Sequence, residues 1–357
     1  MTNIAQLEKR RVTVGVDTHL DVHVASAIDS IGLHLGDFSL PTTTIGYRDV
    51  VSWAKSFGEI ESFGLEGTGC YGAGLARHLG VEGIKVIEVN RPDRSTRHQK
   101  GKSDPIDAQS AARAVLAQTA TSIPKAGNDV VEMIRVLRVA RSTAVKAKTQ
   151  AMNALKSLIV TAPIELRDQL RVLSAVKLIA TVAAFRPGEI TTPSHATRLS
   201  VRILGRRHAE LTKEIDMLDA EVDRLTLEAS PELRELKGVG PEVAAALLQA
   251  VGDNPERVTS EASFAQLCGV APLPASSGKT TRHRLNRGGN RQANAALYRM
   301  VLVRLRWHQP TKDYMKKRLS ENKTKPEIIR CLKRYVAREV FTVLRASDVM
   351  KNLPTAT

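Results

Sequence analysis

Hydrophobic periodicity changes once along this 357-residue chain, and that change limits the folds open to it. Between residues 11 and 40 apolar and polar residues alternate, which indicates a hairpin of strands extended by a third strand. From about residue 128 to 228 the pattern is almost wholly helical. The stretch between them predicts helices and strands in turn, at residues 42–57 (helix), 62–66 (strand), 70–79 (helix) and 84–89 (strand). These patterns predict an α/β domain followed by helical domains.

The length and the 42% hydrophobic content allow two or three domains with real cores. We expect three, at residues 1–125, 126–230 and 231–357. Residues 185–197 contain Pro, Gly and Thr and break the helical pattern of the middle domain, which leaves open antiparallel helices or an insertion hinge, with a simple helical spacer or dimer contact as the plainest interpretation. The same domain carries apolar residues at the spacing of a coiled-coil seam, namely Leu211, Ile215, Leu218, Val222 and Leu225.

A segment of the third domain, LKGVGPEVAAALLQ, is similar to a helix-hairpin-helix. Its Gly238 and Gly240 would expose backbone amides that bind phosphate at a helix N-terminus. A Gly-capped helix turn without a ligand is the alternative. The expected fold class is therefore an α/β N-terminal domain, a central helical (coiled-coil) region and a mainly α C-terminal domain.

The charge of the chain points to a polyanionic partner, with nucleic acid the leading candidate. Lys and Arg number 53 against 37 Asp and Glu, a net charge of +16, and 19 of the basic residues lie between Lys279 and Arg345. A ribosomal or membrane-surface protein would share this balance. However, the sequence has no apolar run of about 18 residues and no signal peptide, so we expect a cytoplasmic, nucleoid-associated protein without a membrane partner.

Other residue types narrow the chemistry further. Aromatic residues make up only 4% of the chain, so backbone contacts by Arg and Lys are expected rather than base stacking. The cysteines lie too far apart for a disulfide framework or a zinc site: Cys70, Cys268 and Cys331. The histidines near the motifs show no metal-ligand spacing and are given no role: His19, His23, His98 and His283.

Four carboxylates stand where a divalent-metal site would need them. Asp17 and Glu66 follow predicted strands. Asp104 and Asp107 open a predicted helix, on which a spacing of three places both on one face. Phosphodiester chemistry uses hard cations such as Mg²⁺ or Mn²⁺, which prefer carboxylate oxygens. In the alternative interpretation these acids are turn, surface and N-cap residues, with Pro105 at the first helical position.

Two hydroxyls, those of Ser276 and Ser277, precede Gly278 in a basic loop. Arginine can clamp a phosphate and stabilise developing charge, and a base, a metal or a cationic site can activate a serine as a nucleophile. A polar phosphate-binding loop without catalysis is the alternative. The residues expected to bind nucleic acid are Lys100, Lys102, Gly238, Gly240, Lys279, Arg282, Arg284, Arg287 and Arg291.

Together these segments resemble the DEDD transposases of bacterial insertion sequences, whose nuclease domain is similar to that of RuvC-type Holliday-junction resolvases. The matching segments are VTVGVDTHLDVHVA around Asp17, FGLEGTGCYG around Glu66, and RHQKGKSDPIDAQSAA around Asp104 and Asp107. The stretch APLPASSGKTTRHRLNRGGNR is similar to the serine-containing second domain of the same family. The resemblance covers nearly the whole chain and implies an RNase H/RuvC-like fold for the N-terminal domain.

The resemblance also implies a mechanism and partners. The catalytic serine of the family corresponds to Ser277, although Ser276 is its neighbour, and the four acids would hold Mg²⁺ or Mn²⁺. A phosphoserine intermediate, double-stranded donor and target DNA, a structured bridge RNA and a homo-tetramer are implied as well. Two other interpretations stay open: a RuvC-like junction resolvase that uses metal-activated water, and a non-enzymatic basic architectural protein that binds DNA or RNA.

Overall fold

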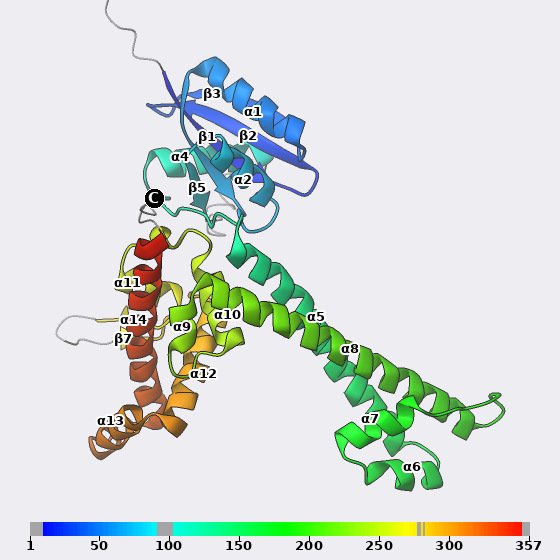
Figure 1. The fold of residues 1–357 in the computed structure, drawn as a ribbon. Helices are drawn as coiled ribbons and strands as arrows, with labels where there is room; N and C mark the ends of the chain where they lie inside the picture. Colours follow the sequence, from blue (N-terminus) through cyan, green and yellow to red (C-terminus); the bar gives the residue numbers. More distant parts are fainter. Residues whose placement is uncertain (1–9, 91–102, 277–279, 281–282, 352–357) are drawn as a thin grey trace, which may run out of the picture. The chain divides into compact units, whose positions relative to one another are not determined.

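The computed structural model describes residues 10–90, 103–276, 280 and 283–351 (Figure 1). The chain forms two compact units. The first holds the chain up to residue 129 together with residues 251–264, and the second holds residues 130–250 and 265–353. The domain boundaries predicted at residues 125 and 230 rest on sequence alone and stay a prediction.

A mixed five-stranded sheet forms the centre of the first unit, with the strand order β3-β2-β1-β4-β5. Strands β1, β2 and β3 are antiparallel neighbours, whereas β4 runs parallel to β1 and β5 runs parallel to β4. This sheet confirms the predicted RNase H-like α/β domain. The strands are β1 (Arg11–Thr18), β2 (Val22–Asp29), β3 (His34–Pro41), β4 (Glu59–Glu66) and β5 (Val86–Val89).

Helices pack on both faces of this sheet. Alternate residues of a strand point to opposite faces, so the buried Val12, Val14 and Val16 of β1 share one face. That face packs against α1 (Thr44–Phe57) and α2 (Ala73–Val81), whose buried residues belong to the same hydrophobic core. The other face of β1 packs against α4 (Asp104–Leu116). Only the α4 face holds acids at the ends of strands β1 and β4.

Residues 251–264 fasten the stretch of chain that follows α4. The Asn254 side chain accepts a hydrogen bond from the Ala126 amide (2.9 Å) and donates one to the Pro124 carbonyl (3.0 Å). The guanidinium of Arg257 donates to the Ile123 carbonyl (2.9 Å). These contacts join parts of the chain more than 120 residues apart. No sequence pattern indicated them.

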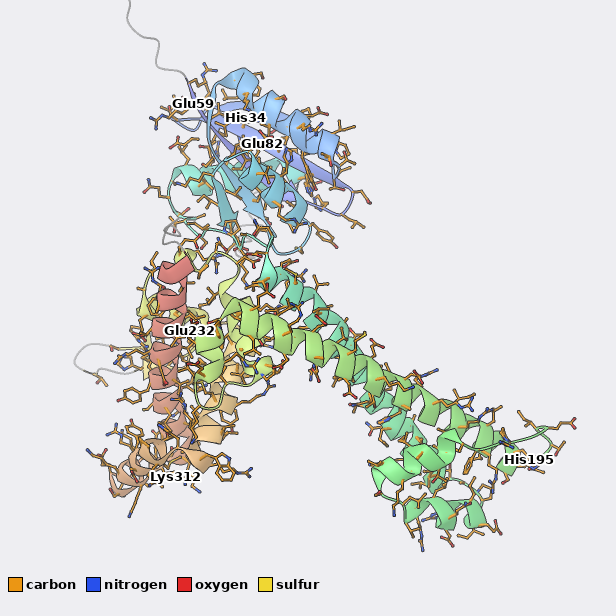
Figure 2. All side chains as sticks on the ribbon, viewed as in Figure 1. His34, Glu59, Glu82, His195, Glu232 and Lys312 are labelled. Carbon is orange, nitrogen blue, oxygen red and sulfur yellow. The ribbon has the colours of Figure 1, made fainter. Side chains whose placement is uncertain are left out.

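Two long helices of the second unit, α5 (Val130–Val160) and α8 (Pro193–Ala229), pack antiparallel along their length (Figure 1). Four of the five predicted seam residues of α8 are buried, and the fifth, Leu211, is half-buried. Two short helices connect α5 to α8 in sequence, α6 (Ile164–Arg171) and α7 (Ala175–Ala183). The predicted break separates α7 from α8, and His195 lies in the first turn of α8 (Figure 2). The helices on either side of the break are therefore antiparallel, one of the arrangements that the sequence left open.

The rest of the second unit is mainly helical, as predicted. A two-stranded ribbon, β6 (Leu273–Pro274) with β7 (His283–Arg284), lies between its helices in sequence. Among the described residues no helix is long and apolar enough to cross a membrane. The helices from residue 231 on are α9 (Pro231–Glu235), α10 (Pro241–Val251), α11 (Glu261–Leu267), α12 (Arg291–Trp307), α13 (Gln309–Ser320) and α14 (Lys325–Lys351). A 3₁₀ turn at Pro255–Arg257 and the start of α11 lie within residues 251–264 of the first unit.

Candidate active site

The ends of two neighbouring parallel strands bring Asp17 and Glu66 together. Strands β1 and β4 pair in register up to Val16 and Leu65, so each acid follows directly at the same edge of the sheet. The hydroxyl of Thr18 donates to the Glu66 carbonyl (3.0 Å), which ties the two strand ends. Both acids are buried, with 8% and 5% of their surface exposed. Burial of two carboxylates at one sheet edge is costly unless a cation neutralises them.

Two glycines place helix α4 against the acid-bearing face. Gly15 and Gly64 lie two residues before Asp17 and Glu66, on the same face of the sheet. A Cβ atom at Gly15 would come within 1.9 Å of the Ala108 carbonyl oxygen of α4. At Gly64 it would lie 3.1 Å from another α4 carbonyl oxygen. The helix backbone therefore occupies the space that side chains would need.

Helix α4 begins with the other two predicted acids. Asp104 is its first residue and Asp107 lies in its first turn, whereas the N-cap is Ser103. The alternative in which Asp104 caps the helix is therefore wrong. Asp104 and Asp107 lie close enough to Asp17 to raise the pKa of its carboxyl group, an effect that adds to the larger one of burial. The acids are held close to one another in spite of this repulsion.

His19, for which no role was predicted from the sequence, lies between two of these acids. Its Nε2 atom is 3.2 Å from Asp17 Oδ2 and 3.6 Å from Asp104 Oδ2. The His19 backbone amide donates to Nδ1 of the buried His23 (3.2 Å), which fixes the turn after β1. A proton on His19 lowers the pKa of Asp17, against the stronger effect of burial. The position of His19 two residues after Asp17, at the end of strand β1, is the sequence signal that could have identified it.

This donor set fits a divalent cation. One ligand atom each from Asp17, His19 and Asp104 can be chosen so that all three lie within 4.8 Å of one another. The two carboxylates are ligands that Mg²⁺ or Mn²⁺ prefers, whereas the imidazole is a ligand of transition metals. Glu66 faces the same side of the sheet and also lines a cavity of about 290 Å³ beside β5 and α4. Lys100 and Lys102, predicted to bind nucleic acid here, lie outside the described residues.

Two regions of the chain match sequence profiles of known families. Residues 14–162 match a transposase profile, that of the DEDD transposases of IS110, and residues 230–316 match the transposase IS116/IS110/IS902 family. The chain belongs to this transposase family. Over 161 residues it is 31% identical to an uncharacterized 43.6 kDa protein of insertion element IS110 from Streptomyces coelicolor. That match covers 44% of this chain and 37% of the Streptomyces protein.

The serine loop of this transposase-family chain lies between β6 and β7. Ser276, at its start, is exposed, whereas Ser277, Lys279 and Arg282 lie outside the described residues. Beyond the loop, Arg284, Arg287 and Arg291 are exposed. Asn290 caps α12 by accepting from the amides of Gln292 and Ala293, each at 3.0 Å. The three arginines thus lie together in sequence between the serine loop and the first turn of α12.

The two glycines of the predicted helix-hairpin-helix form the turn between α9 and α10. Gly238 has a φ of +92°, and a Cβ atom there would lie 3.0 Å from the Met300 carbonyl oxygen, so this position requires glycine. The Val239 amide donates to the Leu236 carbonyl (2.9 Å), which leaves it unable to bind a phosphate. Gly240 is exposed, and a Cβ atom at this position would meet nothing within 4 Å. The amides of Gly238 and Gly240 stay predicted phosphate contacts, whereas the amide of Val239 between them is already used.

Proposed function

We propose that this protein is a transposase that cuts and rejoins double-stranded DNA, with Asp17, Glu66, Asp104 and Asp107 as its metal-binding acids. The observation that carries the proposal is the meeting of buried strand-end acids with the acidic first turn of α4. Membership of the IS116/IS110/IS902 transposase family supports the same reaction class.

The acids would hold Mg²⁺ or Mn²⁺. When bound, such an ion neutralises phosphate charge and stabilises the attacking and leaving oxygens. The buried Asp17 and Glu66 would fix its position because strands β1 and β4 hold them rigidly. Asp104, which is half-exposed at the start of α4, would face the DNA. His19 would either remain as a ligand or turn away.

Ser277 would supply the nucleophile. Its Oγ atom would form a bond to phosphorus while one P–O bond of the DNA backbone breaks, the serine proton passes to a base and the leaving sugar oxygen takes a proton. This step conserves the energy of the broken bond in a phosphoserine linkage, which a second hydroxyl can attack to rejoin DNA. The neighbouring Arg282, Arg284 and Arg287 would stabilise the charge on phosphate.

The remaining parts of the proposal concern partners. A structured bridge RNA would select donor and target DNA, and a homo-tetramer would bring acids and serines of different subunits together. The three predicted regions would then divide the work: residues 1–125 for the metal, 126–230 for subunit contacts and 231–357 for the serine. The exposed apolar residues of the α5–α8 pair, such as Val136 and Met217, are compatible with subunit contacts.

One experiment tests the chemistry. Purified protein is incubated with labelled donor and target DNA, Mg²⁺ and the RNA transcribed from the flanks of its element. We expect a covalent protein–DNA adduct that Ser277→Ala abolishes and the control Ser276→Ala retains. Asp104→Asn should prevent adduct formation. Cleavage that survives Ser277→Ala would instead indicate a junction resolvase using water, and the absence of any cleavage in the parent would favour an architectural protein.

A further inference from the structure

A cleft lined with basic residues runs between three helices of the second unit. It has a volume of about 580 Å³ and is lined by residues of α5, α10 and α12. On α10 the lining residues are three or four positions apart, so one stripe of that helix faces the cleft, whereas α5 contributes a broader face between Arg135 and Lys146. Small residues, Ala246 of α10 and Ala295 of α12, leave its middle open.

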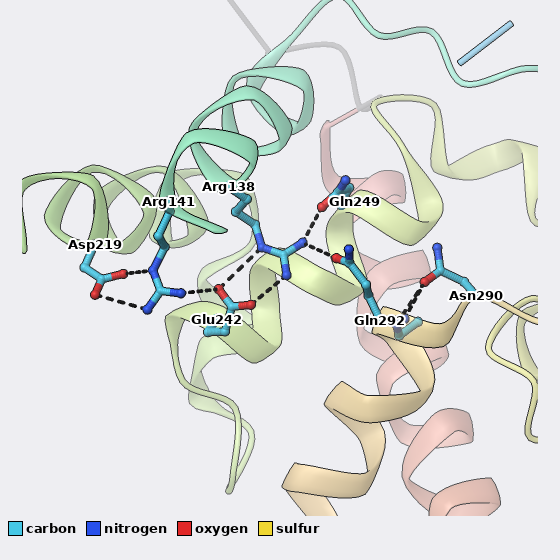
Figure 3. Close-up of polar contacts among 8 residues, drawn as sticks. Arg138, Arg141, Asp219, Glu242, Gln249, Asn290 and Gln292 are labelled. Carbon is cyan, nitrogen blue, oxygen red and sulfur yellow. Dashed lines mark hydrogen bonds and ion pairs between the residues drawn. The ribbon is translucent and has the colours of Figure 1, made fainter. Parts of the chain in front are cut away.

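The wall of this cleft is a fixed network of hydrogen bonds (Figure 3). The Arg138 side chain is only 10% exposed. Its guanidinium donates to both carboxylate oxygens of Glu242 (2.6 and 3.4 Å), to Gln292 (3.0 Å) and to Gln249. Arg141 beside it is bound by Asp219. Helices α5, α8, α10 and α12 are thereby held together, and the shape of the cleft is set before any ligand arrives.

Other cations on the rim have no such partner. Lys146 of α5, together with Arg291 and Arg299 of α12, lines the cleft and is exposed. In the described part of the chain none of the three makes a hydrogen bond or an ion pair. Arg291 also lies in the first turn of α12, where the helix dipole adds positive potential. The cleft thus combines paired arginines in its wall with unpaired cations at its mouth.

A phosphodiester backbone is the ligand that this arrangement fits. Spaced cations favour a chain of negative charges over a single anion. Each phosphate that a cation neutralises releases a counterion from the nucleic acid, and this release adds to the binding free energy. The hydroxyl of Ser142 lines the cleft and can donate to a phosphate oxygen, whereas that of Thr143 donates to the Val139 carbonyl (3.1 Å). Aromatic residues are absent from the lining, so the contacts are made to the backbone rather than to the bases.

We propose that the cleft between α5, α10 and α12 is a second nucleic-acid-binding site, in which Lys146 and Arg299 contact the phosphates of one strand. This inference rests on the proposed function, since it assumes that the protein handles nucleic acid. It adds α5 to the nucleic-acid-binding surface, whereas the residues predicted from the sequence are Lys100, Lys102, Gly238 and Gly240 and the basic residues from Lys279 to Arg291.

Salt dependence of binding tests the site directly. Binding of a labelled random-sequence duplex DNA and of a labelled RNA stem-loop is measured over a range of salt concentrations in EDTA, which prevents cleavage. The slope of log K against log salt is negative, and each lost phosphate contact should reduce its magnitude by about 1. Lys146→Gln and Arg299→Gln should therefore each make the salt dependence shallower by that amount. The probe whose slope changes identifies the bound strand as DNA or RNA.

Matched controls come from exposed cations away from the cleft. Lys156→Gln on the same helix α5 and Arg207→Gln on α8 should leave the slope unchanged. All four variants should keep the melting temperature of the parent because none of these side chains has a partner among the described residues. If the parent binds and the cleft variants have the same salt dependence as the parent, the cleft proposal is wrong while the proposed function stands. If the parent binds neither probe, both are wrong.

A crosslinking readout does not depend on charge. With the photoreactive p-benzoylphenylalanine in place of Ser142, which lines the cleft, illumination should join the protein to the labelled strand. The same residue in place of Lys156 should not. Equal crosslinking at both positions would contradict a defined site and would indicate diffuse attraction to the basic surface.

Discussion

The absence of a side chain at Gly15 and Gly64 determines how closely helix α4 packs on the sheet. Each lies two residues before a predicted metal ligand, and each permits the backbone of α4 to touch the sheet. The acids themselves could be identified in the sequence because they end strands or open a helix. The role of the glycines could not, since close approach between a strand and a helix that is distant in sequence, such as Gly15 to Ala108 or Gly64 to Ala111, is a property of the folded chain.

Substitution of Gly15 tests this contact. Alanine in place of a strand glycine is ordinarily stabilising by roughly 0.5–1 kcal/mol. At Gly15 we expect a loss of about 1–3 kcal/mol or more, because the new methyl group would overlap the Ala108 carbonyl oxygen. Denaturant unfolding measures the difference. The control is Gly80→Ala in α2, where a Cβ atom meets nothing within 4 Å and unfolding should occur at the same or higher denaturant.

Ionisation of the Asp17 carboxyl group should lower the free energy of unfolding of the metal-free protein at neutral pH. Burial, and then repulsion by Asp104 and Asp107, raise the pKa of this carboxyl above its ordinary value of 3.8. The folded state therefore holds the proton more tightly than the unfolded chain does. The free energy of unfolding consequently falls as the pH rises from 3.8 through the folded pKa, and the whole loss is present above that pKa.

The substitution Asp17→Asn removes this ionisation. In EDTA we expect the variant to melt at a higher temperature than the parent at pH 7, and the difference to disappear below the ordinary pKa, where Asp17 is protonated in both states. Added Mg²⁺ should stabilise the parent more than the variant. Equal melting temperatures at pH 7, or equal stabilisation by Mg²⁺, would contradict the assignment of Asp17 as a buried ligand.

At the scale of elements, one arginine joins the C-terminal helices to the turn between α9 and α10. Arg304 of α12 is 8% exposed along its side chain and makes two hydrogen bonds to Glu339 of α14, at 2.6 and 2.9 Å. It also donates to the Lys237 carbonyl at 2.8 Å. A charge count treats Arg304 as part of a nucleic-acid surface, whereas the structure shows it buried in a structural contact.

Replacement of Arg304 by methionine should therefore affect stability before it affects binding. It leaves the Lys237 carbonyl without its donor and Glu339 without its partner, and we expect a cost of about 1–3 kcal/mol in denaturant unfolding. The exposed pair of Lys213 and Glu210 supplies the control, since Lys213→Met should change stability by no more than about 0.5 kcal/mol. Equal effects of the two substitutions would show that Arg304 is no more than a surface charge.

The elements themselves followed from the sequence more closely than their contacts did. Alternating valines placed β1, and the apolar spacing on α8 identified four residues that are buried in the structure. The short helices α6 and α7 were absorbed into one long helical prediction, because their breaks at Pro163 and Ser174 are weak local signals beside the strong helical periodicity. His19 was missed because its ligand spacing involves Asp104, far away in sequence.

On the scale of the whole molecule, the segment 251–264 belongs to the first unit although the chain on both sides of it belongs to the second. Asn254→Ala would remove the hydrogen bonds that this segment makes to Pro124 and Ala126. We expect faster hydrogen exchange at the Ala126 amide, with the α4 amides unaffected. Thr259→Ala, on the exposed end of the same segment, is the control. Unchanged exchange at Ala126 would contradict the role of Asn254 as a fastener.

The same segment sets an order of events on the ribosome. The 121 residues from 130 to 250 are made after the strands and α4 but before Asn254 and Arg257. At about 5–20 residues per second, their synthesis takes roughly 6–24 s, during which the nascent first unit lacks its fastener. The fastening segment ends at Phe264, and the serine loop at Ser276 follows 12 residues later. A prematurely released chain would therefore lack both its fastened nuclease fold and its proposed nucleophile.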